Sequence, residues 1–153
     1  MGKLRLYFDT SVFGGIYDIE FREETQLLFE MVKNGEIICV YSDLCEFELD
    51  KAPEKVKEHF LNLEKKQTEY VEITEEINEL AEEYIKEKVV GETSIDDCRH
   101  IACATLNKVD YLISWNFQHI VNIFSIRGYN AINIKNGHIQ LDIRSPKEII
   151  WNG

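Results

Sequence analysis

The chain has 153 residues, of which 44% are hydrophobic and 29% are charged, and it carries a formal net charge of −11. A chain of this length can bury one core but not two, so we expect a single domain over residues 1–153, and no apolar run approaches the roughly 18 to 20 residues of a membrane helix. The start of the sequence shows no signal-peptide pattern, so a cytoplasmic location is expected, and the acidic charge argues against a general polyanion binder, because phosphate contacts need Lys and Arg.

Short runs of Val, Ile, Leu and Tyr recur along the chain and alternate with segments of helical periodicity. Strands are predicted at residues 4–8, 36–41, 69–73 and 111–114. Helices are predicted at residues 22–33 and 74–89, and residues 54–88, with eleven Glu and six Lys, are expected to contribute two surface helices. This alternation predicts a mainly parallel central sheet with helices packed against it.

The C-terminal part contains a strong turn signal. Asn136-Gly137 lies between two alternating apolar segments, residues 132–134 and 139–143. Asn-Gly is a preferred pair for the two-residue turn of a β-hairpin, because both turn positions need a positive φ. We therefore expect a C-terminal hairpin, which would make one edge of the sheet antiparallel.

Neither the cysteines nor the histidines show the spacing of a metal site. Cys39, Cys45, Cys98 and Cys103 include no Cys-x-x-Cys pair and fall in apolar stretches, so buried free thiols are expected rather than a disulfide or a zinc site. The four histidines form no His-Glu-x-x-His pattern, and His100 is expected to be a helix residue that is packed or satisfied by hydrogen bonds.

Asp9 directly follows the first predicted strand and precedes Thr10 and Ser11. One interpretation is structural, since Asp, Ser and Thr side chains bond nearby backbone groups where a strand turns. The paired glycines Gly14 and Gly15 are less easily explained in that way, because glycine also lets a loop approach another group closely. Taken alone, this carboxylate has both a structural and a functional interpretation.

The segment after the second predicted strand contains three more acids. Asp43 and Glu46 have the spacing of a capping pair, so a structural role is adequate for Glu46. Glu48 lies beside the Leu44 and Phe47 face of the predicted helix, where a carboxylate needs a partner, and a metal ion is one such partner. The alternative is a Glu at the edge of that face whose carboxylate reaches water.

Two further polar residues stand where a helix begins or a strand ends. Ser94-x-x-Asp97 resembles a capping box, which would explain Asp97 without any activity; the alternative is that Asp97 points toward the sheet. Asn116 follows the last predicted strand and can cap the next helix, although its amide oxygen can also ligate a hard cation. Trp115 and Phe117 beside it are expected to pack rather than to stack on bases.

Four of these residues, Asp9, Glu48, Asp97 and Asn116, occur in chain order where strands end or the following helices begin. Residues just beyond the carboxyl ends of parallel strands meet at one crevice. Carboxylates that share such a pocket favour a divalent cation. The order therefore predicts an acidic metal site.

This order resembles the PIN domain, a nuclease family that includes the VapC-like toxins, over nearly the whole chain. Asp9 followed by two hydroxyl residues resembles the first family motif, and Glu48, six residues after Ser42, resembles the second. Asp97 begins the string Asp-x-x-His-Ile-Ala, which resembles the third motif and is the most specific of them. The fourth family position, usually Asp, is Asn116 within Ser-Trp-Asn-Phe, a variant similar to one PIN subgroup.

The resemblance implies a three-layer α/β/α fold, here with the C-terminal hairpin, and hydrolysis of RNA phosphodiester bonds with Mg²⁺ or Mn²⁺. It implies that Asp9, Glu48 and Asp97 hold the metal and form the catalytic site together with Asn116. It also implies an RNA substrate, an antitoxin protein as partner and a homodimer. Because Asn116 removes one negative charge from the four-acid pattern, a second metal is expected to bind weakly without substrate phosphate.

Three other functions remain open on the sequence. A PIN fold without activity would bind RNA or a protein without cutting it, and Asn116 and the acidic surface are compatible with that role. A phosphatase of the haloacid-dehalogenase type also presents an Asp after a strand, but Ser11 stands where that family needs its second Asp, the general acid. The third is a pure protein-binding partner, such as a toxin held by an antitoxin, which is compatible with nuclease activity.

Overall fold

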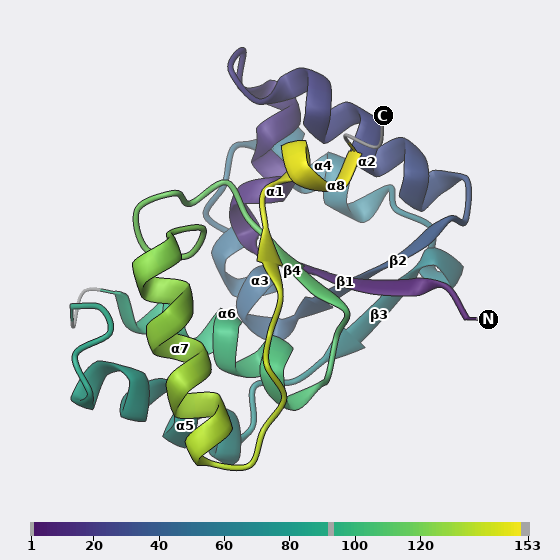
Figure 1. Ribbon diagram of the computed structural model, residues 1–153. Helices are drawn as coiled ribbons and strands as arrows, with labels where there is room; N and C mark the ends of the chain where they lie inside the picture. The colour runs from purple at the N-terminus through teal and green to yellow at the C-terminus, as the bar shows by residue number, and fades with distance from the viewer. Residues whose placement is uncertain (1, 92–93, 151–153) are drawn as a thin grey trace.

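The computed structural model describes residues 2–91 and 94–150 and is built around one sheet. Its strands are β1 (Leu4–Phe8), β2 (Ile37–Ser42), β3 (Thr68–Val71), β4 (Tyr111–Ile113) and β5 (Ile143–Arg144). The five strands lie in the order β3-β2-β1-β4-β5, and each neighbouring pair is parallel (Figure 1). The predicted strands and the parallel sheet are confirmed, with small shifts in the strand boundaries.

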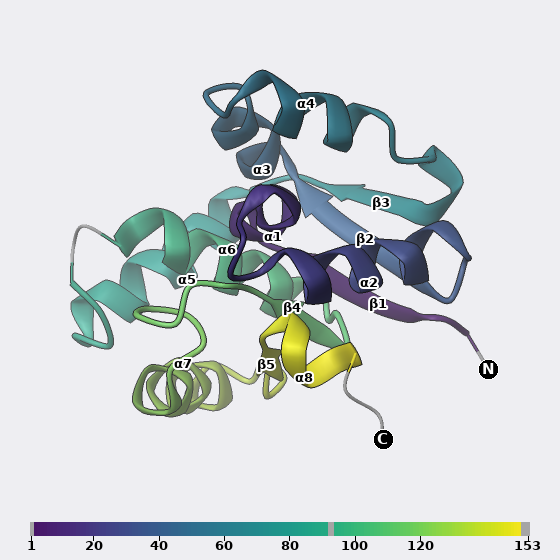
Figure 2. The same cartoon turned by 90° about the horizontal axis from the view of Figure 1, so that it is seen from above.

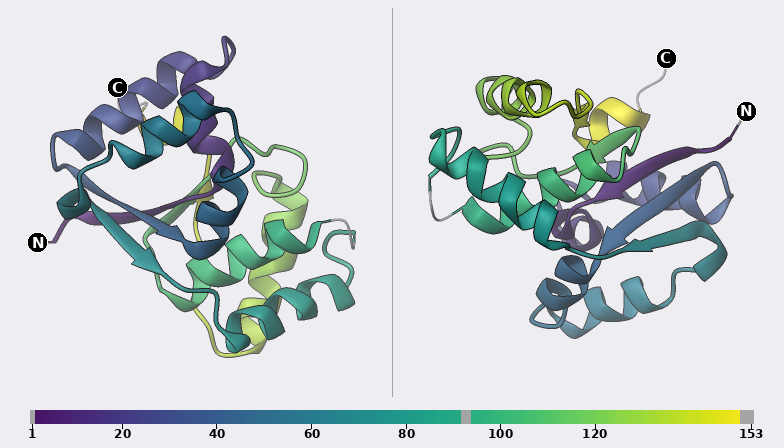
Figure 3. Two further views of the ribbon diagram at one scale, coloured as in Figure 1. Left: turned by 180° about the vertical axis from the view of Figure 1, so that it is seen from behind. Right: turned by 90° about the horizontal axis from the view of Figure 1, so that it is seen from below.

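Helices cover both faces of this sheet and complete three layers (Figure 2). They are α1 (Thr10–Gly14), α2 (Arg22–Lys33), α3 (Asp43–Leu49), α4 (Glu54–Leu61), α5 (Glu75–Lys86), α6 (Ile95–Leu106), α7 (Ile123–Lys135) and α8 (Pro146–Ile150), with the short 3-10 helices η1 (Gly15–Tyr17) and η2 (Lys65–Gln67). One layer contains α1, α2, α4 and α8, and the other contains α5, α6 and α7 (Figure 3). The three-layer α/β/α fold expected from the sequence is therefore present.

The central strand β1 is buried on both faces, because successive side chains of a strand point to opposite sides. Leu6 and Phe8 pack into the core cluster with α1, α2 and α4, whereas Tyr7 packs into the cluster with α5, α6 and α7. All three side chains are fully buried. A polar residue directly after this strand, such as Asp9, therefore emerges into a region already shielded from water.

The expected C-terminal hairpin is wrong. Residues 123–135 form helix α7, and β5 pairs with β4 in parallel, so the described sheet has no antiparallel edge. Asn136-Gly137 ends α7 instead: Gly137 has φ of +78°, and the backbone N–H of His138 donates to the carbonyl of Asn133 at 2.8 Å. A residue in this left-handed conformation is common both at the end of a helix and in the turn of a hairpin. Asn-Gly alone therefore does not distinguish a helix end from a hairpin turn.

The four cysteines are free and buried, as expected from their spacing. Within the described ranges 2–91 and 94–150, no helix combines the length and the apolar character that crossing a membrane requires.

Gly15 allows an unusually close approach between the start of η1 and the segment after β4. A Cβ atom on this residue would lie 2.6 Å from Thr25 Oγ1 and 2.7 Å from Trp115 Nε1. These two atoms are themselves hydrogen bonded, with the indole N–H donating at 2.9 Å, and the indole ring stacks on Phe21 with centroids 4.1 Å apart. Gly15 therefore leaves room for the contact that fixes Trp115, as the predicted packing role of that residue requires.

We expect Gly15→Ala to lower the free energy of unfolding by about 1 to 3 kcal/mol, because the added methyl group must push the indole and the threonine apart. The measurement is urea denaturation followed by circular dichroism. Gly14→Ala is the matched control, since a Cβ there meets no atom within 4 Å and the backbone is helical, with φ of −85°. Equal stability losses in the two variants would contradict this account of Gly15.

Candidate active site

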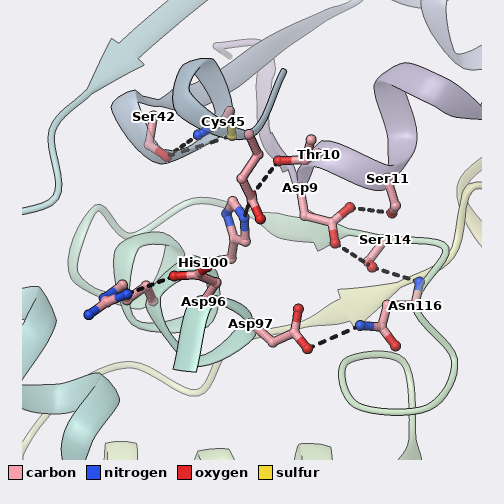
Figure 4. A network of polar contacts seen from close by, with 12 residues as sticks. Asp9, Thr10, Ser11, Ser42, Cys45, Asp96, Asp97, His100, Ser114 and Asn116 are labelled. Atoms are coloured by element: carbon pink, nitrogen blue, oxygen red, sulfur yellow. Dashed lines mark hydrogen bonds and ion pairs between the residues drawn. The ribbon is translucent and has the colours of Figure 1, made fainter. Parts of the chain in front are cut away.

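The four residues singled out in the sequence lie around one region at the carboxyl edge of the sheet. Asp9 follows β1, Glu48 lies on α3 after β2, Asp97 lies in the first turn of α6, and Asn116 follows β4. Figure 4 shows Asp9, Asp97 and Asn116 around a common space, joined to their neighbours by hydrogen bonds. The parallel topology thus brings together side chains that are far apart in the sequence.

Asp9 is only 4% exposed, and both of its carboxylate oxygens accept hydrogen bonds from hydroxyl groups. Ser11 Oγ donates to Oδ1 at 2.6 Å, and Ser114 Oγ donates to Oδ2 at 2.8 Å. Asp9 stands at the N-cap position of α1, but its side chain makes no capping bond to that helix. Its structural interpretation as a turn cap is therefore wrong, and the carboxylate is oriented by one hydroxyl from α1 and one from the loop after β4.

These two hydroxyls also accept hydrogen bonds from the backbone of the loop after β4. The N–H of Trp115 donates to Ser11 Oγ at 3.0 Å, and the N–H of Asn116 donates to Ser114 Oγ at 2.9 Å. The position of Asp9 and the path of this loop are consequently fixed by the same contacts.

Glu48 has two hydrogen-bond partners among the residues that the structure describes. Thr10 Oγ1 donates to its Oε1 atom at 2.7 Å, and His100 Nε2 lies 2.6 Å from the same oxygen. The opposite ring nitrogen, His100 Nδ1, lies 2.7 Å from the hydroxyl of Tyr7. The partner that Glu48 was expected to need is thus supplied by a hydroxyl and a buried imidazole, and His100 is a packed helix residue with both ring nitrogens hydrogen bonded, as expected.

Asp97 and Asn116 contact each other directly. Asn116 Nδ2 donates to Asp97 Oδ2 at 3.2 Å, whereas Asn116 Oδ1 accepts from the backbone N–H groups of Gln118 and His119 at 3.1 and 3.0 Å. Asn116 therefore caps the turn that follows it, and its amide N–H₂ rather than its oxygen faces the acid. The Ser94 side chain makes no capping bond to α6, so the capping-box interpretation of Asp97 is wrong.

The cap of α3 is one residue earlier than the sequence suggests. Ser42 is the N-cap, and its Oγ accepts from the N–H of Cys45 at 3.4 Å. Asp43 Oδ1 instead accepts from the N–H of Ile73 at 2.8 Å, which ties the start of α3 to the segment after β3. The predicted capping pair of Asp43 and Glu46 is therefore wrong.

Burial dominates the electrostatics of the two aspartates. It raises the pKa of Asp9, and the charge of Asp97 adds to this rise, while His100, Ser11 and Ser114 oppose it. Burial also raises the pKa of Asp97, where the charge of Glu48 contributes in the same direction. Both carboxylates are therefore harder to ionise than in water, and a nearby cation would favour their charged forms.

Glu48 shows the opposite behaviour. Burial would raise the pKa of Glu48, but the hydrogen bond and charge of His100, together with Thr10 and Lys51, lower it. Burial would lower the pKa of His100, but contacts with Cys45 and Glu48 and the charge of Asp9 raise it well above its usual value. Glu48 is thus the acid in this region whose charge is already compensated by the protein.

The oxygen-rich composition suits a hard divalent cation, but the side chains do not form a complete cage. Among residues 2–91 and 94–150, no three His, Cys, Asp or Glu side chains are grouped closely enough to hold a metal ion by themselves. Mg²⁺ is commonly bound by one or two carboxylates, with water and substrate phosphate as the other ligands. The carboxylates of Asp9, Glu48 and Asp97 fit this kind of open site in their chemistry.

The residues that hold the acids in place were not among those predicted from the sequence. Thr10, Ser11 and Ser114 donate to the carboxylates, and Tyr7 and His100 support Glu48 from the core. The signals were present, because Thr10 and Ser11 directly follow Asp9, Ser114 lies two residues before Asn116, and His100 lies three residues after Asp97 on the same helix.

We expect Asp9→Asn to raise the free energy of unfolding of the metal-free protein at pH 7, by about 1 kcal/mol. Burial raises the folded-state pKa of Asp9, so the folded protein binds this proton more tightly than the unfolded chain and its ionised form opposes folding. The wild type recovers stability as the pH falls through that pKa. The difference in the free energy of unfolding between the variant and the wild type therefore becomes smaller as the pH approaches the usual pKa of Asp, about 3.9. Urea denaturation with chelator at several pH values tests this, and an advantage that grows on acidification would contradict it.

Neither a family model nor a curated protein sequence matches the chain, but solved structures do. VapC20 of Mycobacterium tuberculosis, described as a toxin that cleaves the sarcin-ricin loop, aligns at 13% identity and a TM-score of 0.58 over 90% of this chain and 98% of that one. VapBC2 of Rickettsia felis, bound to a DNA fragment from its promoter, aligns at 12% identity and a TM-score of 0.57 over 93% of this chain and 98% of that one. A toxin–antitoxin complex from Klebsiella pneumoniae aligns at 18% identity and a TM-score of 0.55 over 74% of this chain and 88% of that one. At these identities the similarity concerns the fold, and the chain has the PIN-domain fold of the VapC toxins.

Proposed function

We propose that this protein is a metal-dependent endoribonuclease that hydrolyses RNA phosphodiester bonds, and that it is the VapC-like toxin of a type II toxin–antitoxin pair. The observation that carries the proposal is that Asp9, Glu48 and Asp97 lie around one region at the carboxyl edge of the sheet, where Asp9 and Asp97 face a common space (Figure 4). The VapC fold supports it, since VapC20 is described as a toxin that cleaves the sarcin-ricin loop.

In this proposal Asp9, Glu48 and Asp97 hold Mg²⁺ or Mn²⁺, and Asn116 completes the catalytic site. The bound ion would lower the pKa of a water molecule and stabilise charge on the phosphate under attack. Ser11 and Ser114 keep both oxygens of Asp9 fixed, and Asn116 holds one oxygen of Asp97 by its amide N–H. No side chain needs to act as a covalent nucleophile.

The proposed partners follow from the same fold. An antitoxin is proposed because the similar structures include a toxin–antitoxin complex and a VapBC pair. RNA is the proposed substrate, and a homodimer of single-domain chains is the proposed assembly. An antitoxin that covers the carboxyl edge of the sheet would restrain the nuclease without any change in its fold.

A second candidate is a PIN fold that binds RNA or protein without cutting. Two observations favour it: Asn116 stands in place of a fourth acid, and the described residues contain no three-ligand group. The phosphatase alternative has less support, because the Ser11 hydroxyl donates to Asp9 and both oxygens of that buried carboxylate are hydrogen bonded, which makes Asp9 a poor nucleophile.

We expect the purified protein to cleave single-stranded RNA with Mg²⁺ or Mn²⁺ and to lose activity by about 100-fold or more in Asp97→Asn, since this substitution removes charge where the cation and phosphate meet. Asp96→Asn is the matched control. Asp96 is the neighbouring acid, but it pairs with Arg99 Nη1 at 2.7 Å rather than with the residues around Asp9.

Cleavage is measured on a fluorescently labelled RNA, with chelator as the blank. Equal activity in Asp97→Asn and the wild type would exclude the proposed site. RNA binding without metal-dependent cleavage would favour the second candidate.

We expect Asn116→Asp to strengthen Mn²⁺ binding about tenfold, because it adds a carboxylate oxygen beside Asp97 and raises the charge of the ligand set. An aspartate can still accept the hydrogen bonds from Gln118 and His119 that Asn116 Oδ1 accepts now, so the loop should be preserved. Calorimetric titration with Mn²⁺ tests this. Unchanged or weaker affinity would argue that position 116 lies outside the metal site.

A further inference from the structure

A chain of buried side chains leads from the core of the protein to Glu48. Ser42 Oγ lies 2.8 Å from the Tyr7 hydroxyl, which lies 2.7 Å from His100 Nδ1, and His100 Nε2 lies 2.6 Å from Glu48 Oε1. Ser42 and Tyr7 are fully buried and His100 is 2% exposed. These side chains come from β2, β1, α6 and α3, and the series ends at Glu48, one of the acids of the candidate active site.

Each hydrogen bond between these four side chains has one donor and one acceptor. An ionised Glu48 only accepts hydrogen bonds, so His100 must donate through Nε2. In a neutral imidazole, Nδ1 accepts from Tyr7, whose oxygen accepts from Ser42. In an imidazolium both ring nitrogens carry a proton, so Nδ1 donates to the Tyr7 oxygen and the Tyr7 hydroxyl donates to Ser42 Oγ. Ser42 then donates to Cys45 Sγ at 3.6 Å. All of these hydrogen bonds can form with either a neutral or a protonated His100, so the placement of Glu48 does not depend on the charge of His100.

The contacts with Glu48 are asymmetric. Thr10 and His100 both bind Oε1, at 2.7 and 2.6 Å. In the part of the chain that the structure describes, Oε2 has no hydrogen-bond partner. One oxygen of this carboxylate is therefore held by the protein, and the other is available to an incoming group.

We propose that His100, supported by Tyr7 and Ser42, is a positioning residue that fixes the Glu48 carboxylate by one oxygen and leaves the other for a divalent cation. The inference rests on the proposed function, in which Glu48 helps to hold the metal. His100 itself contacts neither metal nor RNA. A histidine that only filled the core would not need its ring nitrogens matched to a carboxylate on one side and a hydroxyl on the other.

Three variants separate positioning from packing. Tyr7→Phe removes only the hydroxyl that supports the imidazole and keeps the ring that fills the core. His100→Leu removes the donor to Glu48, whereas His100→Gln retains an N–H donor at nearly the same distance from the backbone. Tyr84→Phe is the matched control, because Tyr84 is also fully buried and its hydroxyl donates to Asn133, away from the acids.

Mn²⁺ affinity is measured by calorimetry without RNA, and kcat and KM are then measured on labelled RNA. Loss of a residue that orients a metal ligand typically weakens affinity by about 10- to 100-fold, and we expect about tenfold for His100→Leu and a smaller loss for Tyr7→Phe. His100→Gln should retain most of the affinity, and Tyr84→Phe all of it. The loss should appear in kcat more than in KM, because the substrate itself does not touch His100.

Crystal structures of the metal-free variants provide a readout that needs neither metal nor activity. We expect the Glu48 carboxylate to move or lose order in His100→Leu and Tyr7→Phe but not in His100→Gln. An unchanged, well-ordered Glu48 in the first two variants overturns the positioning role. If the wild type binds no Mn²⁺ or cuts no RNA, the proposed function fails while these structures still decide the role of His100. If His100→Leu does not fold, Tyr7→Phe decides the question.

Discussion

The burial of charge at the end of a covered strand is the constraint on which this site depends. Asp9 follows β1, whose two faces are both packed under helices, so water cannot solvate its carboxylate. An isolated charge in such surroundings is very unfavourable, and the hydroxyls of Ser11 and Ser114 replace the missing water. Because the same hydroxyls bind the backbone of Trp115 and Asn116, the charge of Asp9 also fixes the loop after β4.

The three acids are not equivalent, and the difference indicates what a cation would contribute. Glu48 is stabilised in its charged form by His100, whereas burial raises the pKa of both Asp9 and Asp97. A divalent cation would therefore favour ionisation mainly at the aspartates. It would also change the local charge of a protein with a net charge of −11, whose surface alone would repel RNA. In the proposed nuclease the ion thus serves binding of the phosphate backbone as well as hydrolysis.

The sequence was sufficient to predict the sheet because strand identity depends on local composition: residues 4–8 are rich in Leu, Tyr and Phe, and residues 36–41 are rich in Ile and Val. It failed at Asn136-Gly137, because one dipeptide can end a helix or turn a hairpin. The residues before this dipeptide favour the helix, because Tyr129 and Ile132 are buried on one side of α7 and the exposed Ile134 lies on another. A three-residue alternation was too short to distinguish that helical pattern from a strand.

The acids could be found from their positions after strands, but their supporting contacts could not, because these depend on how α6 is rotated about its axis. Tyr7 and His100 are separated by 93 residues, and Glu48 and His100 by 52. The helix carries Asp97 and His100 three residues apart, which places them on neighbouring parts of one face. Asp97 contacts Asn116, and His100 contacts Glu48, so a single rotation of α6 satisfies both contacts. The hydrogen bond between Tyr7 and His100 restrains that rotation from β1, the strand that Asp9 follows, so β1, α3 and α6 together set the spacing of all three acids.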